Sequence, residues 1–196
     1  MIVAYGGERT LDWSTVADIE GRLLQDLSRD AEAEAKLERS CDVAAFVLPA
    51  SSTGIASCLM DLAQSRRSRG KHREALELVS RALAIDVARL GPDHTDVGEL
   101  YQVRGNIEYA LGDRAATIAD FERACAILER ALAGPKSVGP GSLGAAEWAL
   151  GQVVWKDDHA RGRDLISRAI GHLTGQARFA AELADATAWM KRWGER

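Results

Sequence analysis

Residues 73–113 read REALELVSRALAIDVARLGPDHTDVGELYQVRGNIEYALGD, and this stretch decides the fold. Its first half has helical periodicity, with Leu76, Val79 and Leu83 on one face and charged residues on the others. A connector containing Pro92 interrupts the pattern, and a second helical stretch runs up to Gly112, where we expect a turn. The stretch therefore predicts two helices and a proline-containing connector, and no strand pattern competes with this interpretation.

Residues of the same kind recur through the chain at a period of 42 residues. The recurring positions are a small residue in a first helix (Gly21, Ala63, Gly105), a turn (Ser28, Gly70, Gly112) and, in a second helix, a small residue (Ala33, Ala75, Thr117), a large apolar residue (Leu37, Val79, Phe121) and another small residue (Ser40, Ala82, Ala124). Antiparallel helices approach closely only where one side chain is minimal, and a large apolar residue fills the adjoining hole. Each period is therefore expected to be one pair of packed helices.

A fourth copy of the pattern follows with a shift in spacing. Gly151 follows Gly105 by 46 residues, and Ile166 follows Phe121 by 45. The surplus residues lie in the glycine- and proline-rich stretch 133–144, and insertions of this kind belong in loops.

Composition and charge exclude several classes of protein. The chain has 196 residues and a mass of 21.2 kDa, which suits one domain with a sizeable core. Its net charge of −4 argues against a general affinity for nucleic acid or anionic membranes, because both need a basic excess. The first residues lack a signal-peptide pattern and no run of eighteen apolar residues occurs, so we expect neither export nor a membrane span. Because the repeat begins so early, the chain could be a segment of a larger protein.

The three cysteines, Cys41, Cys58 and Cys125, have an odd count and no C-x-x-C spacing. We therefore expect neither a disulfide framework nor a zinc site, and a reducing cytosol as the compartment. Cys41 and Cys125 lie two periods apart, which indicates a packing role inside helices rather than nucleophilic chemistry.

The A-L-E-L-V-S-R-A-L-A-I helix and the LGPDHTD connector within 73–113 resemble the tetratricopeptide repeat in its 42-residue form, as found in kinesin light chains and many bacterial regulatory proteins. The resemblance covers about residues 13–172, and Thr117, Ser28 and the short turn at 156–159 depart from the usual pattern. It implies an all-α, right-handed α-solenoid of about four helical hairpins, forming a single domain over 1–196. The expected repeats are about 13–50, 55–92, 97–134 and 143–174, and an amphipathic helix at about 176–193, with Phe179, Leu183, Ala186 and Met190 on one stripe, is expected to cap the stack.

Members of this family bind peptides or partner domains in a groove lined by the first helix of each pair, and the resemblance implies such a groove here. Helical geometry places three rows on that face: Arg22, Gln64, Asn106 and Gln152; then Asp18, Met60, Gln102 and Trp148 four residues earlier; and Gln25, Arg67, Tyr109 and Trp155 three residues later. The predicted partner-binding residues are Asp18, Arg22, Gln64, Arg67, Gln102, Asn106, Tyr109, Trp148, Gln152 and Trp155.

The amides and the aromatic residues in these rows suggest what the groove would recognise. Amide side chains donate and accept hydrogen bonds, so they can hold the backbone of an extended ligand. Tyr109, Trp148 and Trp155 would supply the aromatic anchors in which binding hot spots are enriched. Two alternatives stay open: exposed helix positions are polar in any protein, and Trp148 or Trp155 could instead pack against the C-terminal helix.

We find no arrangement of residues with the spacing of a catalytic or metal site. The basic run 66–73 straddles a helix end, where cations are favoured, and it lacks interleaved aromatic residues for base stacking. Asp157, Asp158 and His159 adjoin one another but suit a loop that begins a helix better than a metal site. The stretch GPKSVGPGS lacks the order of a phosphate-binding loop.

These observations lead us to expect a non-catalytic, cytoplasmic scaffold or adaptor that binds a protein or peptide with micromolar affinity, without a cofactor, a metal, nucleic acid or a membrane. The alternative is a regulatory or oligomerisation module of a larger signalling assembly that includes a kinase, protease or ATPase. In that case the C-terminal helix, with Trp189 or Trp193, would form the contact and self-association would be expected.

Overall fold

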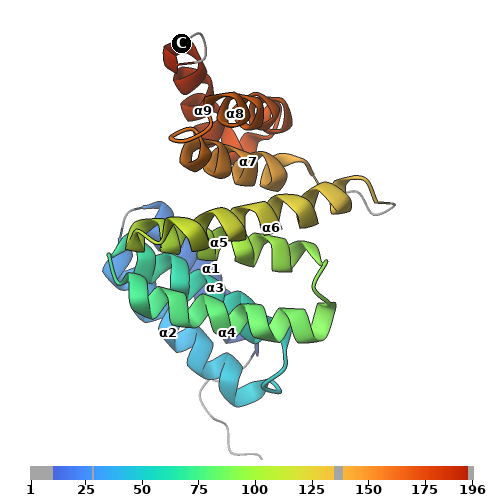
Figure 1. Cartoon of the computed structure of the whole chain (residues 1–196). Coiled ribbons are helices and arrows are strands. Elements are labelled where there is room, and N and C mark those ends of the chain that lie inside the picture. The colour runs from blue at the N-terminus through green and yellow to red at the C-terminus, as the bar shows by residue number, and fades with distance from the viewer. Residues whose placement is uncertain (1–10, 28, 135–138, 194–196) are drawn as a thin grey trace, which may run out of the picture. The chain divides into compact units, whose positions relative to one another are not determined.

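In the computed structural model, every regular element within the described residues, which are 11–27, 29–134 and 139–193, is a helix (Figure 1). The turn predicted at Ser28 and the loop residue Pro135 lie outside this part of the chain. The chain divides into two compact units, Met1–Pro92 and Asp93–Arg196, and we describe each unit by itself. The expectation that all four hairpins form a single domain stays a prediction.

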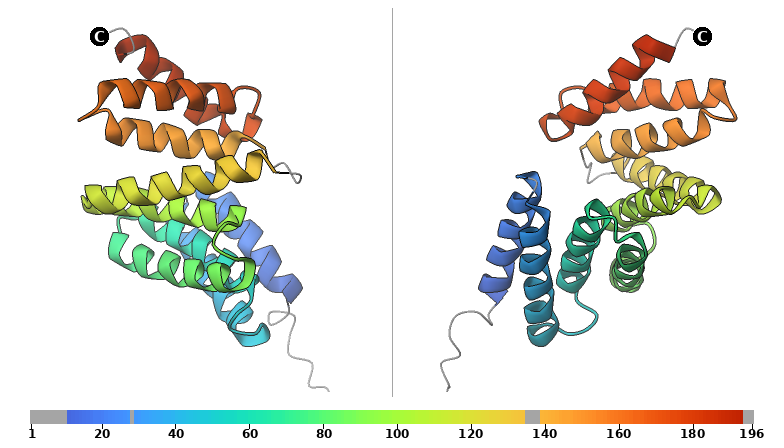
Figure 2. Two further views of the ribbon diagram at one scale, coloured as in Figure 1. Left: turned by 45° about the vertical axis from the view of Figure 1, so that its right-hand side comes forward. Right: turned by 90° about the vertical axis from the view of Figure 1, so that its left-hand side faces the viewer.

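The first unit consists of two helical hairpins. Helix α1 (Leu11–Asp26) pairs with α2 (Asp30–Val47), and α3 (Thr53–Ser68) pairs with α4 (His72–Leu90). Helix α2 packs on α3, which joins the two hairpins, and α1 lies beside α3. The right-hand view of Figure 2 shows α1 and α2 side by side along their whole length.

The second unit contains two further hairpins and a final helix. Helix α5 (Thr95–Leu111) pairs with α6 (Arg114–Leu132), and α7 (Gly141–Val154) pairs with α8 (His159–Leu173). A short 3-10 helix, η1 (Ala177–Phe179), leads into α9 (Ala180–Trp193), which packs on α8 and also touches α7. The successive layers α6, α7, α8 and α9 can be followed in the left-hand view of Figure 2. These hairpins confirm the predicted all-α repeat fold.

The first, third and fourth hairpins each close on a glycine facing a large apolar residue, as the repeat predicts. A Cβ atom added to Gly105 would lie 2.7 Å from Cε1 of Phe121, and one added to Gly21 would lie 2.6 Å from Cγ of Leu37. In the fourth hairpin, a Cβ atom on Gly151 would lie 2.6 Å from Cγ1 of Ile166. Such distances are far inside van der Waals contact, so the helices reach their spacing only because the first helix has no side chain there.

Turn chemistry ends the first helices of the second and third hairpins. Gly70 and Gly112, one period apart, have φ values of 75° and 82°, in the left-handed region that glycine adopts without steric cost. After Gly112, the carboxylate of Asp113 accepts a hydrogen bond from the backbone N–H of Ala116 at 3.0 Å and caps α6. The predicted turns at Gly70 and Gly112 are therefore tight reversals between antiparallel helices.

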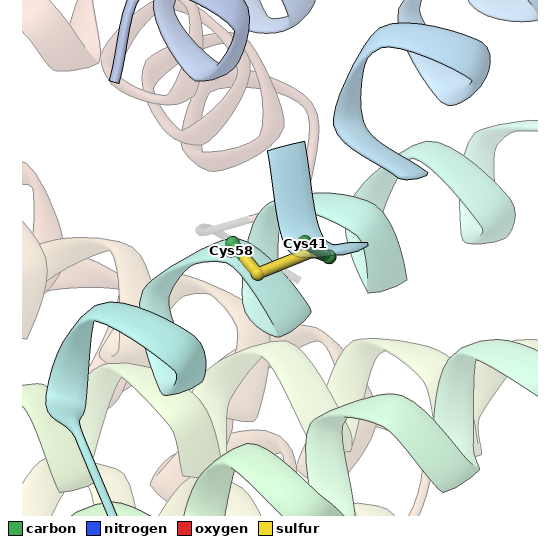
Figure 3. The surroundings of a disulfide bond; sticks show 2 residues. All are labelled: Cys41 and Cys58. Atoms are coloured by element: carbon green, nitrogen blue, oxygen red, sulfur yellow. A yellow bond between two sulfur atoms is a disulfide. The ribbon is translucent and has the colours of Figure 1, made fainter. Parts of the chain in front are cut away.

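The cysteine prediction was wrong for two of the three residues. Cys41 on α2 and Cys58 on α3 form a disulfide with their Cα atoms 5.5 Å apart, which links the first hairpin to the second (Figure 3). Their sequence separation of 17 matches no motif, and the pairing arises only because α2 and α3 pack against each other. Cys125 is free and buried, and burial, followed by the charge of Glu147, raises its pKa to about 12, which suits a packing role.

Replacing Gly105 with Ala tests the close approach of α5 and α6. We expect a loss of about 1–2 kcal/mol in the free energy of unfolding, because overpacking against Phe121 outweighs the higher helix propensity of alanine. Urea denaturation followed by circular dichroism measures the change. The matched control is Gly171→Ala, since a Cβ atom on Gly171 of α8 meets nothing within 4 Å, and this variant should be up to about 1 kcal/mol more stable. Equal stability of the two variants would contradict the packing argument.

Reduction of the disulfide should loosen the first unit. In the chain-entropy account, closing a loop of this length stabilises the fold by about 3 kcal/mol. We therefore expect the thermal transition of the first unit to fall when a reductant is added, and to fall equally in the Cys41→Ser/Cys58→Ser variant without reductant. Thiol titration of the unreduced, denatured protein should find one free thiol, that of Cys125. A count of three thiols would contradict the disulfide.

Candidate binding groove in the second unit

Three hollows lie along one face of the second unit, where α5, α7 and α9 present their side chains. The first lies between α5 and α7 and has a volume of about 130 Å³. Its lining residues are Asn106, Tyr109, Phe121, Ala149, Gln152 and Val153. Three residues of the predicted groove, Asn106, Tyr109 and Gln152, are thus brought together here.

The other two hollows flank the first. One, of about 340 Å³, is lined by Tyr109, Gly112, Arg114, Val153 and Lys156. The other, of about 470 Å³, lies between α7 and α9 and is lined by Trp148, Gln152, Asp185, Ala188, Trp189, Arg192 and Trp193. The first hollow shares Tyr109 and Val153 with the 340 Å³ hollow, and it shares Gln152 with the 470 Å³ hollow. The three hollows are therefore neighbours, and we call them together the α5–α7–α9 groove.

The aromatic residues of the groove contact the final helix. The ring of Trp189 on α9 lies 6.4 Å from Trp148 and 4.6 Å from Trp155, edge-on in both cases, and Trp155 also lies 4.3 Å from the ring of His159. The alternative that Trp148 or Trp155 packs against the C-terminal helix therefore holds for both residues. Trp148 nevertheless still lines the groove, whereas Trp155 is not among the lining residues of the three hollows.

Helix α9 supplies groove residues that the sequence analysis did not assign to the groove. Asp185, Ala188, Trp189, Arg192 and Trp193 all line the hollow between α7 and α9. A signal for them was present, because Trp189 follows Trp148 by 41 residues and Trp193 follows Gln152 by 41, which is close to one repeat. The last helix therefore stands where the first helix of a further hairpin would stand, and it continues the lining of the groove as well as covering α8.

Two of the predicted residues of the first unit, Asp18 and Arg22, form a charged cluster with Asp61. The guanidinium of Arg22 on α1 lies 3.8 Å from the carboxylate of Asp18 and 3.6 Å from that of Asp61 on α3. Burial raises the pKa of Asp18 from its usual value, and Arg22 opposes the rise. Gln64 and Arg67 are half-buried on α3, and Gln102 is half-buried on α5 without lining the three hollows. The binding roles of all these residues stay predictions.

A buried carboxylate fixes α7 against α8 next to Trp148. Glu147 has no exposed surface and accepts a hydrogen bond from Nε of Arg168 at 2.7 Å, while Nδ1 of His172 lies 2.7 Å from its other oxygen. A buried charge of this kind needs partners that replace water, and α8 supplies both of them. Arg168 and His172 therefore fix the orientation of α7 about its own axis through Glu147. In this orientation Trp148 and Gln152 face the groove.

Two carboxyl groups, that of Glu108 on α5 and that of Asp120 on α6, lie close together beside Arg104. Arg104 donates hydrogen bonds to both oxygens of Asp120, at 2.5 and 2.7 Å, but its Nε lies 3.8 Å from Glu108. Burial, followed by the charge of Asp120, raises the pKa of Glu108 to about 7, with Asp113 adding to the rise and Arg104 opposing it. Glu108 is only 9% exposed, and its pKa therefore lies close to neutral pH.

Three cations of the basic run at 66–73, which was predicted to lie at a helix end, pair with glutamates. Lys71 lies 2.7 Å from the buried carboxylate of Glu34, Arg69 also contacts it, and Arg66 lies 2.6 Å from Glu38. Burial alone would raise the pKa of Glu34, but Lys71 and Arg69 hold it below its usual value. These cations therefore serve the packing of α2 against α3.

Other candidate sites resolve into ordinary structure. The carboxylate of Asp158 accepts a hydrogen bond from the backbone N–H of Arg161 at 2.9 Å, so this residue caps α8 as the sequence indicated. Within the described residues, no group of three His, Cys, Asp or Glu side chains is arranged to hold a metal ion. None of the helices described here is long and apolar enough to cross a membrane.

The helices, their spacing and the groove define the class of protein as an all-α repeat solenoid. Residues 54–133 match the tetratricopeptide repeat family. The crystal structure of BtubC (BKLC) from P. vanneervenii is similar, with a TM-score of 0.68, 18% identity, and coverage of 95% of this chain and 68% of that chain. A kinesin-light-chain-type protein from Podosopora anserina with nearly identical TPR-like repeats has a TM-score of 0.71 and 18% identity, covering 95% of this chain and 90% of that chain.

Identities this low show a common fold, and they carry no information about ligands. A comparison with curated proteins gives no significant match. The residues that match the tetratricopeptide repeat family, 54–133, make up the second and third hairpins, and the chain shares its fold with the kinesin-light-chain-type structures.

Glu108→Gln should change how the stability of the second unit depends on pH. A carboxyl group with a raised pKa in the folded state stabilises the fold below its unfolded pKa, and this contribution is lost as pH rises towards about 7. Unfolding experiments should therefore show little difference between variant and wild type near pH 4, and a variant more stable by about 1–2 kcal/mol near pH 8, after allowance for partial screening by water. The exposed Glu77 gives the control substitution Glu77→Gln. Parallel pH profiles for wild type and Glu108→Gln would contradict this assignment.

Proposed function

We propose that this chain is a non-catalytic interaction scaffold that binds an extended peptide segment of a partner protein in the α5–α7–α9 groove. The observation that carries the proposal is that Asn106 of α5 and Gln152 of α7 line the same hollow. An amide offers both a donor and an acceptor, so two amides from neighbouring helices can pair with a peptide backbone regardless of its sequence.

Tyr109 supports the same function from a different direction. Its side chain is 55% exposed, although it is a large residue in the middle of the groove and belongs to two of the three hollows. Exposed aromatic residues with a polar tip are enriched among the residues that dominate binding energy. We expect the affinity for an unstructured peptide to be on the order of micromolar, because ordering the peptide consumes much of the contact energy.

The proposal also concerns what the chain does not bind. The net charge is −4, and Arg66, Arg69 and Lys71 of the basic run are paired with glutamates, which argues against nucleic acid and anionic membranes as partners. A cytoplasmic location remains part of the proposal, although the Cys41–Cys58 disulfide removes the cysteine argument for a reducing compartment.

A second candidate function is that of a regulatory or oligomerisation module, and one observation favours it. Helix α1 exposes the apolar side chains of Val16, Ile19 and Leu23, whose spacing places them on one stripe, and Leu27 is exposed directly after the helix ends. The sequence predicts self-association through Trp189 of the C-terminal helix. Trp189 is less suitable than α1 for this contact, because its ring packs on Trp148 and Trp155 within the same chain. Sedimentation velocity over a range of concentrations separates the two functions, since a strict monomer excludes self-association.

Peptide selection on the immobilised chain tests the groove directly. A peptide recovered from a random display library should bind the purified protein with a micromolar dissociation constant in calorimetry, and Asn106→Ala/Tyr109→Ala should weaken it about tenfold or more without lowering the melting temperature. The control pair is Asp164→Ala/Ser167→Ala on α8, because both residues are exposed and neither lines a hollow of the groove. Unchanged affinity in the groove variant would remove the proposal, and so would turnover of a substrate by the purified chain.

A further inference from the structure

The hollow between α7 and α9 has walls from two helices. Trp148 and Gln152 are four residues apart on α7, so they share one face of that helix. On α9, Asp185, Ala188 and Trp189 are followed one turn later by Arg192 and Trp193, which again places the lining residues on one face. Two opposed helix faces and a volume of about 470 Å³ give room for several residues of an extended chain.

The aromatic walls of this hollow are held in place by neighbouring rings. Trp189 is edge-on to Trp148 and also packs against Trp155, which does not line the hollow, so its orientation is fixed from behind. One turn further along α9, the guanidinium of Arg192 lies 5.0 Å from the ring of Trp193. A ligand would therefore meet aromatic side chains that are already ordered, because their conformational entropy is lost when the chain folds and not when a ligand binds.

The polar groups of the hollow favour donors over acceptors. The indoles of Trp148 and Trp189 and the guanidinium of Arg192 are of types that only donate hydrogen bonds, whereas acceptors come from the carboxylate of Asp185 and the amide oxygen of Gln152. An ordinary peptide brings as many backbone N–H groups as carbonyls, but proline brings a carbonyl and no N–H. Proline-rich sequence therefore offers acceptors to this lining without adding donors that it cannot pair.

Charge does not favour a different ligand. Asp185 and Arg192 face the same hollow with opposite charges, so the lining is neutral overall and selects neither a cationic nor an anionic peptide. The apolar rings of proline can pack on the aromatic faces of this lining better than charged side chains can. A polyproline II helix is also ordered before it binds.

From these contacts we propose that the hollow between α7 and α9 binds a proline-rich segment of the partner in the polyproline II conformation. This inference rests on the proposed function, because it assigns a ligand class to one end of the α5–α7–α9 groove. It also gives α9 a role in recognition.

The test uses the full chain and a capped decaproline peptide as the probe, with glycine–serine, oligoglutamate and oligolysine peptides of equal length for comparison. Calorimetry should find decaproline binding with a dissociation constant on the order of 100 μM, about tenfold or more tighter than the glycine–serine peptide. Decaproline binding no tighter than the glycine–serine peptide, or weaker than either charged peptide, would overturn the inference.

Two substitutions on α9 locate the binding. Ala188 lines the hollow and is exposed, so Ala188→Trp should fill the hollow without disturbing the core and weaken decaproline binding about tenfold. Ala184 is also exposed, lies one turn earlier and does not line the hollow, so Ala184→Trp should leave the affinity within about twofold. Circular dichroism melts confirm that both variants fold, and equal effects of the two substitutions would contradict the location.

The peptide selected from the random display library separates the scaffold proposal from the proline-rich assignment. If it binds in a manner sensitive to Asn106→Ala/Tyr109→Ala while decaproline does not bind, the proline-rich assignment fails and the scaffold function stands. If decaproline binding is lost in Ala188→Trp but no selected peptide depends on Asn106 and Tyr109, the hollow is confirmed as a separate site and the wider groove fails.

Discussion

The fold depends on the close contact between a glycine of the first helix and a bulky apolar residue on the second helix of the same hairpin. Gly105 against Phe121 is the clearest case, and Gly151 against Ile166 repeats it in the fourth hairpin. Where this contact sets the spacing, the remaining apolar residues of the two helices come into van der Waals contact and bury one another. The groove follows from the same contact, because the residue after each small one, such as Asn106 or Gln152, is turned away from the partner helix.

Periodicity was sufficient to predict the helical pairs, since small, turn and large positions are properties of the sequence itself. Gly70 and Gly112 were identified as turns from spacing alone, and both adopt the left-handed conformation that makes glycine useful there. The Cys41–Cys58 bond was missed because it depends on how two separate helices pack, and no local spacing encodes such a contact. The buried ion pairs of Glu34 and Glu147 were missed for the same reason, since glutamate in a helix normally indicates an exposed position.

The sequence predicted part of the lining of the groove. Asn106, Tyr109 and Gln152 do line one hollow, because helical geometry alone fixes which face they share. The place of Trp148 could not be resolved from sequence, since a tryptophan that packs on the last helix and one that lines a groove give the same pattern. Trp148 both packs on Trp189 and lines the hollow between α7 and α9. Treating α9 only as a cap hid its contribution to the groove, although its tryptophans follow the repeat.

The disulfide between α2 and α3 also alters the covalent topology of the first unit. The chain from Cys41 to Cys58 becomes a closed ring that contains the whole connector around Pro49 between the hairpins. A protease that cut this connector would leave both fragments attached through sulfur, and the nicked protein would migrate as one species until it was reduced. Tension applied to the first hairpin would likewise pass to α3 through the sulfur bridge, and the connector itself would carry no load.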